Sequence, residues 1–239
     1  MKHTPKLIAE FLGTFGLTFF GAGAICADRL VRGSAAFGPI DLLLIASAHA
    51  VVLVVMVSAL GHLSGAHFNP AVTLGALIGR HITASVAVMY WATQLVAAIA
   101  AAGLLLFFFP TAITNSVAVG APVPAVDASH AFVVEIVLTI FLVTVVYATA
   151  IDPRGAFGKI AGIAIGAVLF FDILVGGPLT GAAMNPARAF GPALVAAAAG
   201  VGGVLDGQHF LIYWLGPAIG GVIAALLYQR LLLRDSAPD

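Results

Sequence analysis

The tripeptide Asn-Pro-Ala occurs twice in this chain, and each copy lies inside a run of apolar residues. The two copies are Asn69-Pro70-Ala71 and Asn185-Pro186-Ala187. Asn is a favoured N-cap of helices, and Pro is favoured at the first helical position because it has no N–H to leave unpaired. Each copy therefore predicts a loop that turns into a helix at membrane depth. Irregular backbone survives there only if protein buries it or it lines a watery cavity. Two such places predict a pore.

The composition indicates that the bilayer is the solvent of this chain. Of its 239 residues, 62% are hydrophobic and 8% are charged, whereas soluble domains carry about 25% charged residues. The formal net charge is +0, so a nucleic-acid partner is not expected. The single cysteine, Cys26, allows no internal disulfide and no Cys-based metal site. No His, Asp and Glu set has metal-ligand spacing, and we expect neither a metal nor a cofactor.

Membrane spans of roughly 20 apolar residues can be placed along the whole chain. The predicted spans are 7–27, 41–60, 83–109, 129–150, 160–175 and 210–233. The predicted half-helices are 69–79 and 185–197; about ten helical residues cover roughly 15 Å, half a membrane. A polar loop with Asp28, Arg29 and Arg32 is expected after the first span, and a long loop over 110–127. The fold class is thus an all-α membrane protein with six transmembrane helices and two re-entrant half-helices.

The two halves, about 1–120 and 121–239, repeat one plan within a single transmembrane channel domain. Glu10 and Glu135 each lie in the first span of their half, with a Thr four residues later. Because each half has three spans, the halves lie in opposite orientations, as in the inverted repeats of transporters. Buried carboxylates are expensive in a membrane. We expect these two to support the re-entrant loops by accepting backbone hydrogen bonds, rather than to carry ions.

The distribution of Lys and Arg predicts the orientation. With the N-terminus inside, the cytoplasmic side carries Lys2, Lys6, Arg80, Arg154, Lys159, Arg230 and Arg234. The other side carries Arg29, Arg32 and Arg188. This bias follows the positive-inside rule. We expect a multi-pass protein with both termini cytoplasmic, in the plasma (inner) membrane.

These motifs together resemble the aquaporin (major intrinsic protein) family. The resemblance covers nearly the whole chain and rests on residues 9–14, 64–73, 184–188 and 214–217. It implies a homotetramer with one pore per subunit, and a selectivity filter formed by His49, Ile173, Ala182 and Arg188. That set resembles the filter of plant vacuolar aquaporins, some of which also pass ammonia, urea or hydrogen peroxide. For His49, the alternative is a core histidine bonded to a helix carbonyl.

The chemistry of these residues suits water and opposes cations. A helix N-terminus carries about +0.5 elementary charge, so two that meet at mid-membrane repel cations and hydronium. The Asn69 and Asn185 amides can each donate to a passing water. Backbone carbonyls along the path are expected from Gly65, Ala66, His67, Gly181, Ala182 and Ala183. Arg188 is costly inside a membrane unless it faces a polar cavity, where it would exclude cations.

The sequence leaves three function classes to compare. The leading one is a passive water channel that excludes protons and ions, with small neutral solutes as further candidates. Ile173 in place of an aromatic or His side chain favours a wider filter, so ammonia, urea and hydrogen peroxide stay open. Glycerol is less favoured, because the glycerol branch resembles a pattern with Asp and a basic residue where Ala189 and Ala193 stand. An ion-coupled transporter is the second class. A membrane enzyme is the third, and no nucleophile–base pair supports it.

Overall fold

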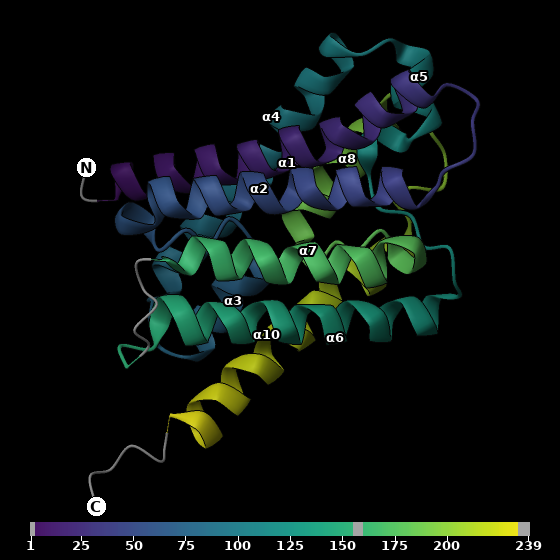
Figure 1. The fold of residues 1–239 in the computed structure, drawn as a ribbon. Helices are drawn as coiled ribbons and strands as arrows, with labels where there is room; N and C mark the ends of the chain where they lie inside the picture. The colour runs from purple at the N-terminus through teal and green to yellow at the C-terminus, as the bar shows by residue number, and fades with distance from the viewer. Residues whose placement is uncertain (1–2, 155–159, 234–239) are drawn as a thin grey trace, which may run out of the picture.

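The computed structural model describes residues 3–154 and 160–233. Within these residues all regular secondary structure is helical, and Figure 1 shows long helices packed side by side into one bundle. The positive-inside argument also used Lys2, Lys159 and Arg234, which lie outside the described residues.

Six helical segments of the described chain are long and apolar enough to cross a membrane, as predicted. The first three are α1 (Thr4–Arg32), α2 (Pro39–Ser64) and α4 (Ala84–Phe108). The fourth is α6 (Ala128–Val146) with the π-turn η2 (Tyr147–Ile151), and the fifth is α7 (Ala161–Thr180). The sixth combines α9 (Gly207–Phe210), η4 (Leu211–Leu215), α10 (Gly216–Leu227) and η5 (Tyr228–Leu232).

Two connections differ from the prediction. Asp28, Arg29 and Arg32 belong to the last turns of α1 rather than to a loop. The Arg32 Nε donates to the Asp28 carboxylate, 3.1 Å away and one turn earlier, so polar residues continue the helix beyond the apolar stretch. The predicted loop over 110–127 also contains a short helix, α5 (Thr111–Ser116), and the 3₁₀ turn η1 (Ala118–Gly120). Hydropathy marks where the bilayer ends, not where the helix ends.

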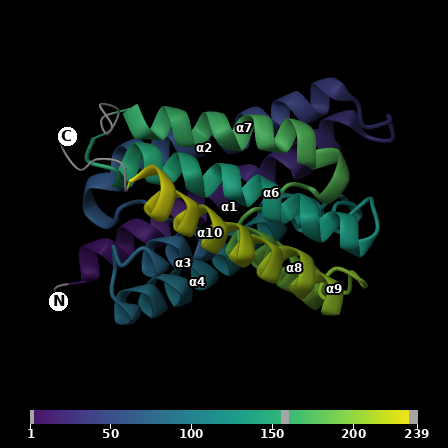
Figure 2. The ribbon, with the colours of Figure 1, turned by 90° about the horizontal axis from the view of Figure 1, so that it is seen from below.

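Two shorter helices begin at the Asn-Pro-Ala segments. They are α3 (Pro70–Ile78) and α8 (Pro186–Ala198), within a residue or two of the predicted half-helices. Helix α3 packs against α4 and α10, and α8 packs against α4. Figure 2 shows α3, α4 and α10 as neighbours on one side of the molecule.

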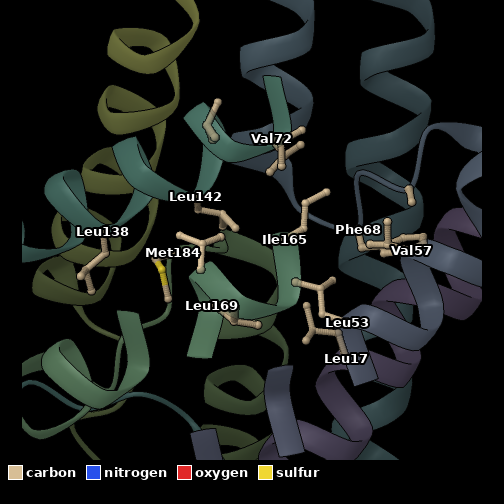
Figure 3. Packing of buried hydrophobic residues seen from close by; sticks show 14 of the residues in the cluster. Leu17, Leu53, Val57, Phe68, Val72, Leu138, Leu142, Ile165, Leu169 and Met184 are labelled. Carbon is tan, nitrogen blue, oxygen red and sulfur yellow. The ribbon is translucent and has the colours of Figure 1, made fainter. Parts of the chain in front are cut away.

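The residues just before each Asn anchor the loops in the core. Phe68 and Met184 are both 0% exposed. In Figure 3, Phe68 lies beside Val57, and Met184 lies near Leu138 on the other side of the core. The ring of Phe68 fills the space above Gly13, where a Cβ atom would come within 2.1 Å of it. Large side chains thus fix the loops from opposite sides, and both helix starts are held in the middle of the bundle.

Candidate functional site

The two Asn side chains cap their half-helices in the same way. The Asn69 Oδ1 accepts from the backbone N–H of Ala71 at 2.8 Å. The Asn185 Oδ1 accepts from the N–H of Ala187 at 3.0 Å and of Arg188 at 3.2 Å. Both Asn residues have extended backbone angles, as an N-cap requires. Capping fixes each amide at the start of its helix, with the NH₂ group pointing away from the helix.

The two starts are hydrogen-bonded to one another across the molecule. The Asn69 Nδ2 donates to the Met184 carbonyl at 2.8 Å, and the Asn185 Nδ2 donates to the Phe68 carbonyl at 2.9 Å. These bonds join residues more than a hundred positions apart and bring the positive ends of α3 and α8 together. An amide has two N–H donors. One from each Asn is used here, and the second has no partner among the described residues.

Two buried carboxylates hold the loops that lead into the half-helices. Glu10 accepts from the N–H groups of His67 (2.9 Å) and Phe68 (2.8 Å). Glu135 accepts from those of Ala183 (2.9 Å) and Met184 (2.7 Å). Both carboxylates are 0% exposed. These four hydrogen bonds hold the two loops in the way that we expected of Glu10 and Glu135 from the sequence.

Five further residues take part in this support, and the sequence analysis missed them: the Gln94 Nε2 donates to the Glu10 carboxylate at 2.8 Å, and the other four form matching pairs in the two repeats. The hydroxyls of Ser64 and Thr180 donate to Glu10 and Glu135, and each also accepts from the N–H two residues later. The hydroxyls of Tyr90 and Tyr213 donate to the carbonyls of Ser64 (2.8 Å) and Thr180 (2.7 Å). The signal was present in the repeat: a hydroxyl residue precedes Gly-Ala in both loops, and Tyr-Trp occurs at 90–91 and at 213–214.

These bonds determine where the loop carbonyls point. Within a trans peptide the C=O is directed opposite to the N–H. The N–H groups of residues 66–68 are bound to Ser64 and Glu10, so the carbonyls of Gly65, Ala66 and His67 are directed away from this support. The same holds for the carbonyls of Gly181, Ala182 and Ala183, opposite Thr180 and Glu135. The backbone reaches these carbonyl directions with positive φ angles at Ala66 and Phe68 in the first loop, and at Ala182 and Met184 in the second. Such angles are strained for non-glycine residues and persist only under firm support.

A narrow cavity is lined by four of these six loop residues, whereas Gly65 and Gly181 are not part of its lining. It offers about 30 Å³ to the centres of water molecules, enough for only a few. Its polar lining comes from His49, His67, Asn69, Asn185 and Arg188, with Ala66, Ala182 and Ala183 beside them. The rest is apolar and comes from Leu17, Leu53, Val72, Leu142, Val146, Ile165 and Leu169. The lining thus combines a few polar groups with many apolar side chains.

Arg188 and His49 meet at this cavity. The Arg188 Nη2 lies 3.2 Å from the His49 Nε2. Because a guanidinium has donors only, this Nε2 accepts, and the other ring nitrogen must carry the proton. Nδ1 accordingly donates to the Ile45 carbonyl at 2.9 Å. His49 therefore makes the hydrogen bond to a helix carbonyl that the alternative interpretation expected, and it also lines the cavity. The Arg188 Nη1 has no partner in the described part of the chain.

Ile173 is the one expected filter residue that is not among the cavity lining. It is 3% exposed and packs in the core of the bundle. It lies one turn beyond Leu169 and two beyond Ile165, both of which line the cavity, so the three share one face of α7. The expectation that it belongs to the filter rests on this position alone.

Comparisons with known proteins agree on one relationship. Residues 1–228 match the family described as Major intrinsic protein. The chain is 48% identical over 234 residues to "Probable aquaporin TIP3-2" of Arabidopsis thaliana, covering 95% of this chain and 83% of that protein. It is 42% identical over 231 residues to "Aquaporin TIP2-1" of Zea mays, covering 96% and 88%. Its fold is similar to the aquaglyceroporin from Plasmodium falciparum, with a TM-score of 0.81 at 24% identity, covering 96% and 97%.

Proposed function

This chain belongs to the major intrinsic protein family and is a passive transmembrane water channel, and we propose that water crosses it through the cavity between the two half-helices. The observation that carries this proposal is the pair of cross-bonded Asn caps, whose amides line that cavity. Each amide has one donor left for a water oxygen. A water bound to both points its hydrogens outward, which interrupts the hydrogen-bonded chain that proton hopping requires.

The carbonyl rows supply the complementary acceptors. Gly65, Ala66 and His67 in one loop, and Gly181, Ala182 and Ala183 in the other, present carbonyls directed away from the buried glutamates. Water that passes along them exchanges one acceptor for the next. The apolar side chains of the lining offer no hydrogen bond, so each water has few partners in the cavity and is released easily. This favours rapid passage in single file.

The selectivity filter is proposed to consist of His49, Ile173, Ala182 and Arg188. Arg188 is 3% exposed, and its charge next to the cavity opposes cations and hydronium in a medium of low dielectric constant. The positive ends of α3 and α8 add to this barrier. His49 holds the guanidinium in place through its Nε2. Ala182 adds little bulk, and Ile173 adds no donor.

We also propose that some small neutral solutes cross the same pore. A filter with one isoleucine and one alanine favours ammonia, urea or hydrogen peroxide as further permeants over glycerol. An ion-coupled transporter is less favoured, because both buried glutamates are fully engaged in loop bonds.

The protein is an integral multi-pass membrane protein. We propose that both termini face the cytoplasm, as the positive-inside bias suggests, and that four copies form a homotetramer with a pore in each. The plasma membrane is the location we expected from the sequence. Fluorescent tagging in the native cell tests the location, and crosslinking in membranes tests the tetramer.

Stopped-flow light scattering on proteoliposomes tests the water path. We expect fast osmotic shrinkage with a low activation energy, no proton current and no dependence on an ion gradient. The same vesicles, challenged with ammonia, urea, hydrogen peroxide and glycerol, define the solute range. Water permeability at the level of protein-free vesicles would refute the proposed path.

A further inference from the structure

The ring of His67 lines the water cavity, and its two nitrogens have different surroundings. Its Nδ1 lies 3.1 Å from the Thr73 hydroxyl of α3. Its Nε2 makes no hydrogen bond within the described residues, yet packing does not seal this atom from water. A neutral imidazole has one N–H and one bare nitrogen. The nitrogen that carries the proton therefore decides whether water meets a donor or an acceptor at this ring.

A buried carboxylate sets the direction of the hydrogen bonds behind the ring. Glu10 accepts four hydrogen bonds, two at each oxygen. One of them comes from the Gln94 Nε2 at 2.8 Å. An ionised carboxylate has about four acceptor sites and no proton to donate. The Gln94 amide must therefore turn its nitrogen toward Glu10, because the reversed amide would place one acceptor against another.

The same direction continues through Thr73. The Gln94 Nε2 donates its second N–H to the Thr73 hydroxyl oxygen at 3.0 Å. The hydrogen of the Thr73 hydroxyl then needs another acceptor, and within the described residues it contacts only the His67 Nδ1. Thr73 is 0% exposed, so leaving this hydrogen unpaired would be unfavourable. Nδ1 is therefore the bare nitrogen, and the ring proton is on Nε2.

The second repeat holds its loop without these three residues. When the repeats are aligned on their Asn caps and on their Tyr-Trp pairs, the corresponding positions are Ala183, Ala189 and Pro217. Glu135 nevertheless supports its loop through the two equivalent backbone N–H groups. Loop support thus does not require this row of side chains, and the remaining direction in which it acts is the pore.

We propose that Gln94 and Thr73 are positioning residues of the pore, which hold His67 as the neutral tautomer with its proton on Nε2, directed at the water path. The unpaired hydroxyl that the other tautomer would leave corresponds to a preference of roughly 5- to 150-fold. The two histidines of the cavity are then of opposite kind. The His49 proton is on Nδ1, and its Nε2 accepts from Arg188.

A fixed Nε2–H acts in the same sense as the Asn amides. This consequence rests on the proposed water path. His67 lies two residues before Asn69 in the same loop, so its donor takes the oxygen of a water close to the one that Asn69 binds. A bare Nε2 would instead attract a water hydrogen and offer a place for a proton. The tautomer thus keeps a basic nitrogen out of the path and adds to the exclusion of protons.

Solid-state NMR of the isotope-labelled full chain in liposomes reads the tautomer directly, because protonated and bare ring nitrogens have well-separated chemical shifts. His67 is assigned through its links to Ala66 and Phe68, and His49 provides a reference of the opposite kind. We expect wild-type His67 to be protonated on Nε2, with the other tautomer in at most about a sixth of the molecules. Equal amounts of the two tautomers, a majority protonated on Nδ1, or a charged ring at neutral pH would overturn the proposal.

Exchanging one amide nitrogen for oxygen should reverse the tautomer. In Gln94→Glu the new carboxyl faces Glu10, and two carboxyl groups that share a site cannot both ionise. Its single proton binds to Glu10, and its other oxygen accepts from the Thr73 hydroxyl. Thr73 then accepts from the His67 Nδ1, and Nε2 becomes bare. A ring that stayed protonated on Nε2 in this variant would overturn the positioning role of Gln94.

The hydroxyl of Thr73 is tested by a matched pair of substitutions. Thr73→Val removes the hydroxyl at nearly constant shape and should bring the two tautomers to comparable amounts, whereas Thr73→Ser should restore the wild-type form. Thr93→Val is the control, because the Thr93 hydroxyl donates to the Met89 carbonyl of its own helix. It should leave the tautomer unchanged. Identical spectra for Thr73→Val and wild type would overturn the role of Thr73.

Proton leakage of the same vesicles tests the consequence for the pore. Gln94→Glu should raise leakage severalfold in a pH-gradient dye assay, and Thr73→Ser should not. A reversed tautomer with wild-type leakage would overturn the role in proton exclusion. The wild-type spectrum needs no variant and no conduction, so it stays decisive if a variant fails to fold. A lack of water flow in stopped-flow experiments would refute the water path and leave the tautomer standing.

Discussion

A methyl group added at Gly21 should displace His49, one of the proposed filter residues. Gly21 lies on α1, and a Cβ atom there would lie 2.5 Å from both the Cδ2 and the Nε2 atoms of His49. Non-bonded carbon atoms separate to about 3.5 Å or more. In Gly21→Ala the imidazole must therefore move by about 1 Å, or α1 must move away from α2.

The imidazole cannot make that shift without cost. Its Nδ1 donates to the Ile45 carbonyl at 2.9 Å, and its Nε2 accepts from Arg188 at 3.2 Å. A displacement of about 1 Å takes at least one of these contacts beyond hydrogen-bond range. Overpacking of this kind costs about 1–3 kcal/mol. The cavity has room for only a few waters. If about 1.4 kcal/mol of this cost enters the barrier to permeation, water flow falls about tenfold.

Stopped-flow shrinkage of proteoliposomes measures the effect, normalised to the protein reconstituted. Gly103→Ala is the matched control, because a Cβ atom there meets nothing within 4 Å. The double variant Gly21→Ala/His49→Ala removes the ring and should restore water flow while admitting larger solutes. If folded Gly21→Ala conducts water like wild type with the same solute profile, His49 does not form part of the constriction.

Four further outcomes are expected. Arg188→Val should raise proton leakage severalfold in a pH-gradient dye assay, and unchanged proton conductance would count against its barrier role. Glu135→Ala leaves two buried N–H groups unpaired at about 1–3 kcal/mol each, so the melting temperature in detergent and the water flow should both fall. A melting temperature equal to that of wild type would contradict the proposed loop support. Hydrogen bonds from Arg154 hold the pKa of Asp152 well below its usual range. The stabilisation that ionised Asp152 gives to the folded protein should therefore be complete above about pH 4 and be lost only at lower pH. A difference in melting temperature between wild type and Asp152→Asn that changed between pH 5 and pH 8 would contradict this expectation. Cys26 is free and 0% exposed, so mercury should inhibit weakly, and strong inhibition abolished by Cys26→Ser would reverse that expectation.

Local chemistry made much of the architecture predictable. The apolar stretches located all six membrane-spanning segments, since a segment in hydrocarbon must satisfy its backbone internally as a helix. Asn69-Pro70 and Asn185-Pro186 located the starts of α3 and α8, because capping and the missing proline N–H act within a few residues. The end of α1 was not predictable from hydropathy, because polar residues extend it past the apolar stretch.

The sequence by itself therefore determined the helical spans, the two capped half-helices and the buried glutamates of each repeat. Only the tertiary structure decided how these parts meet. The contact between Arg188 and His49 joins residues 139 positions apart, and the bonds from Asn69 and Asn185 cross from one repeat to the other. Such pairings depend on how the helices pack, and packing energy is summed over many weak contacts that no short stretch of sequence contains. For the same reason, the hydrogen bonds that run from Gln94 through Thr73 to His67 could not be predicted before the fold was known.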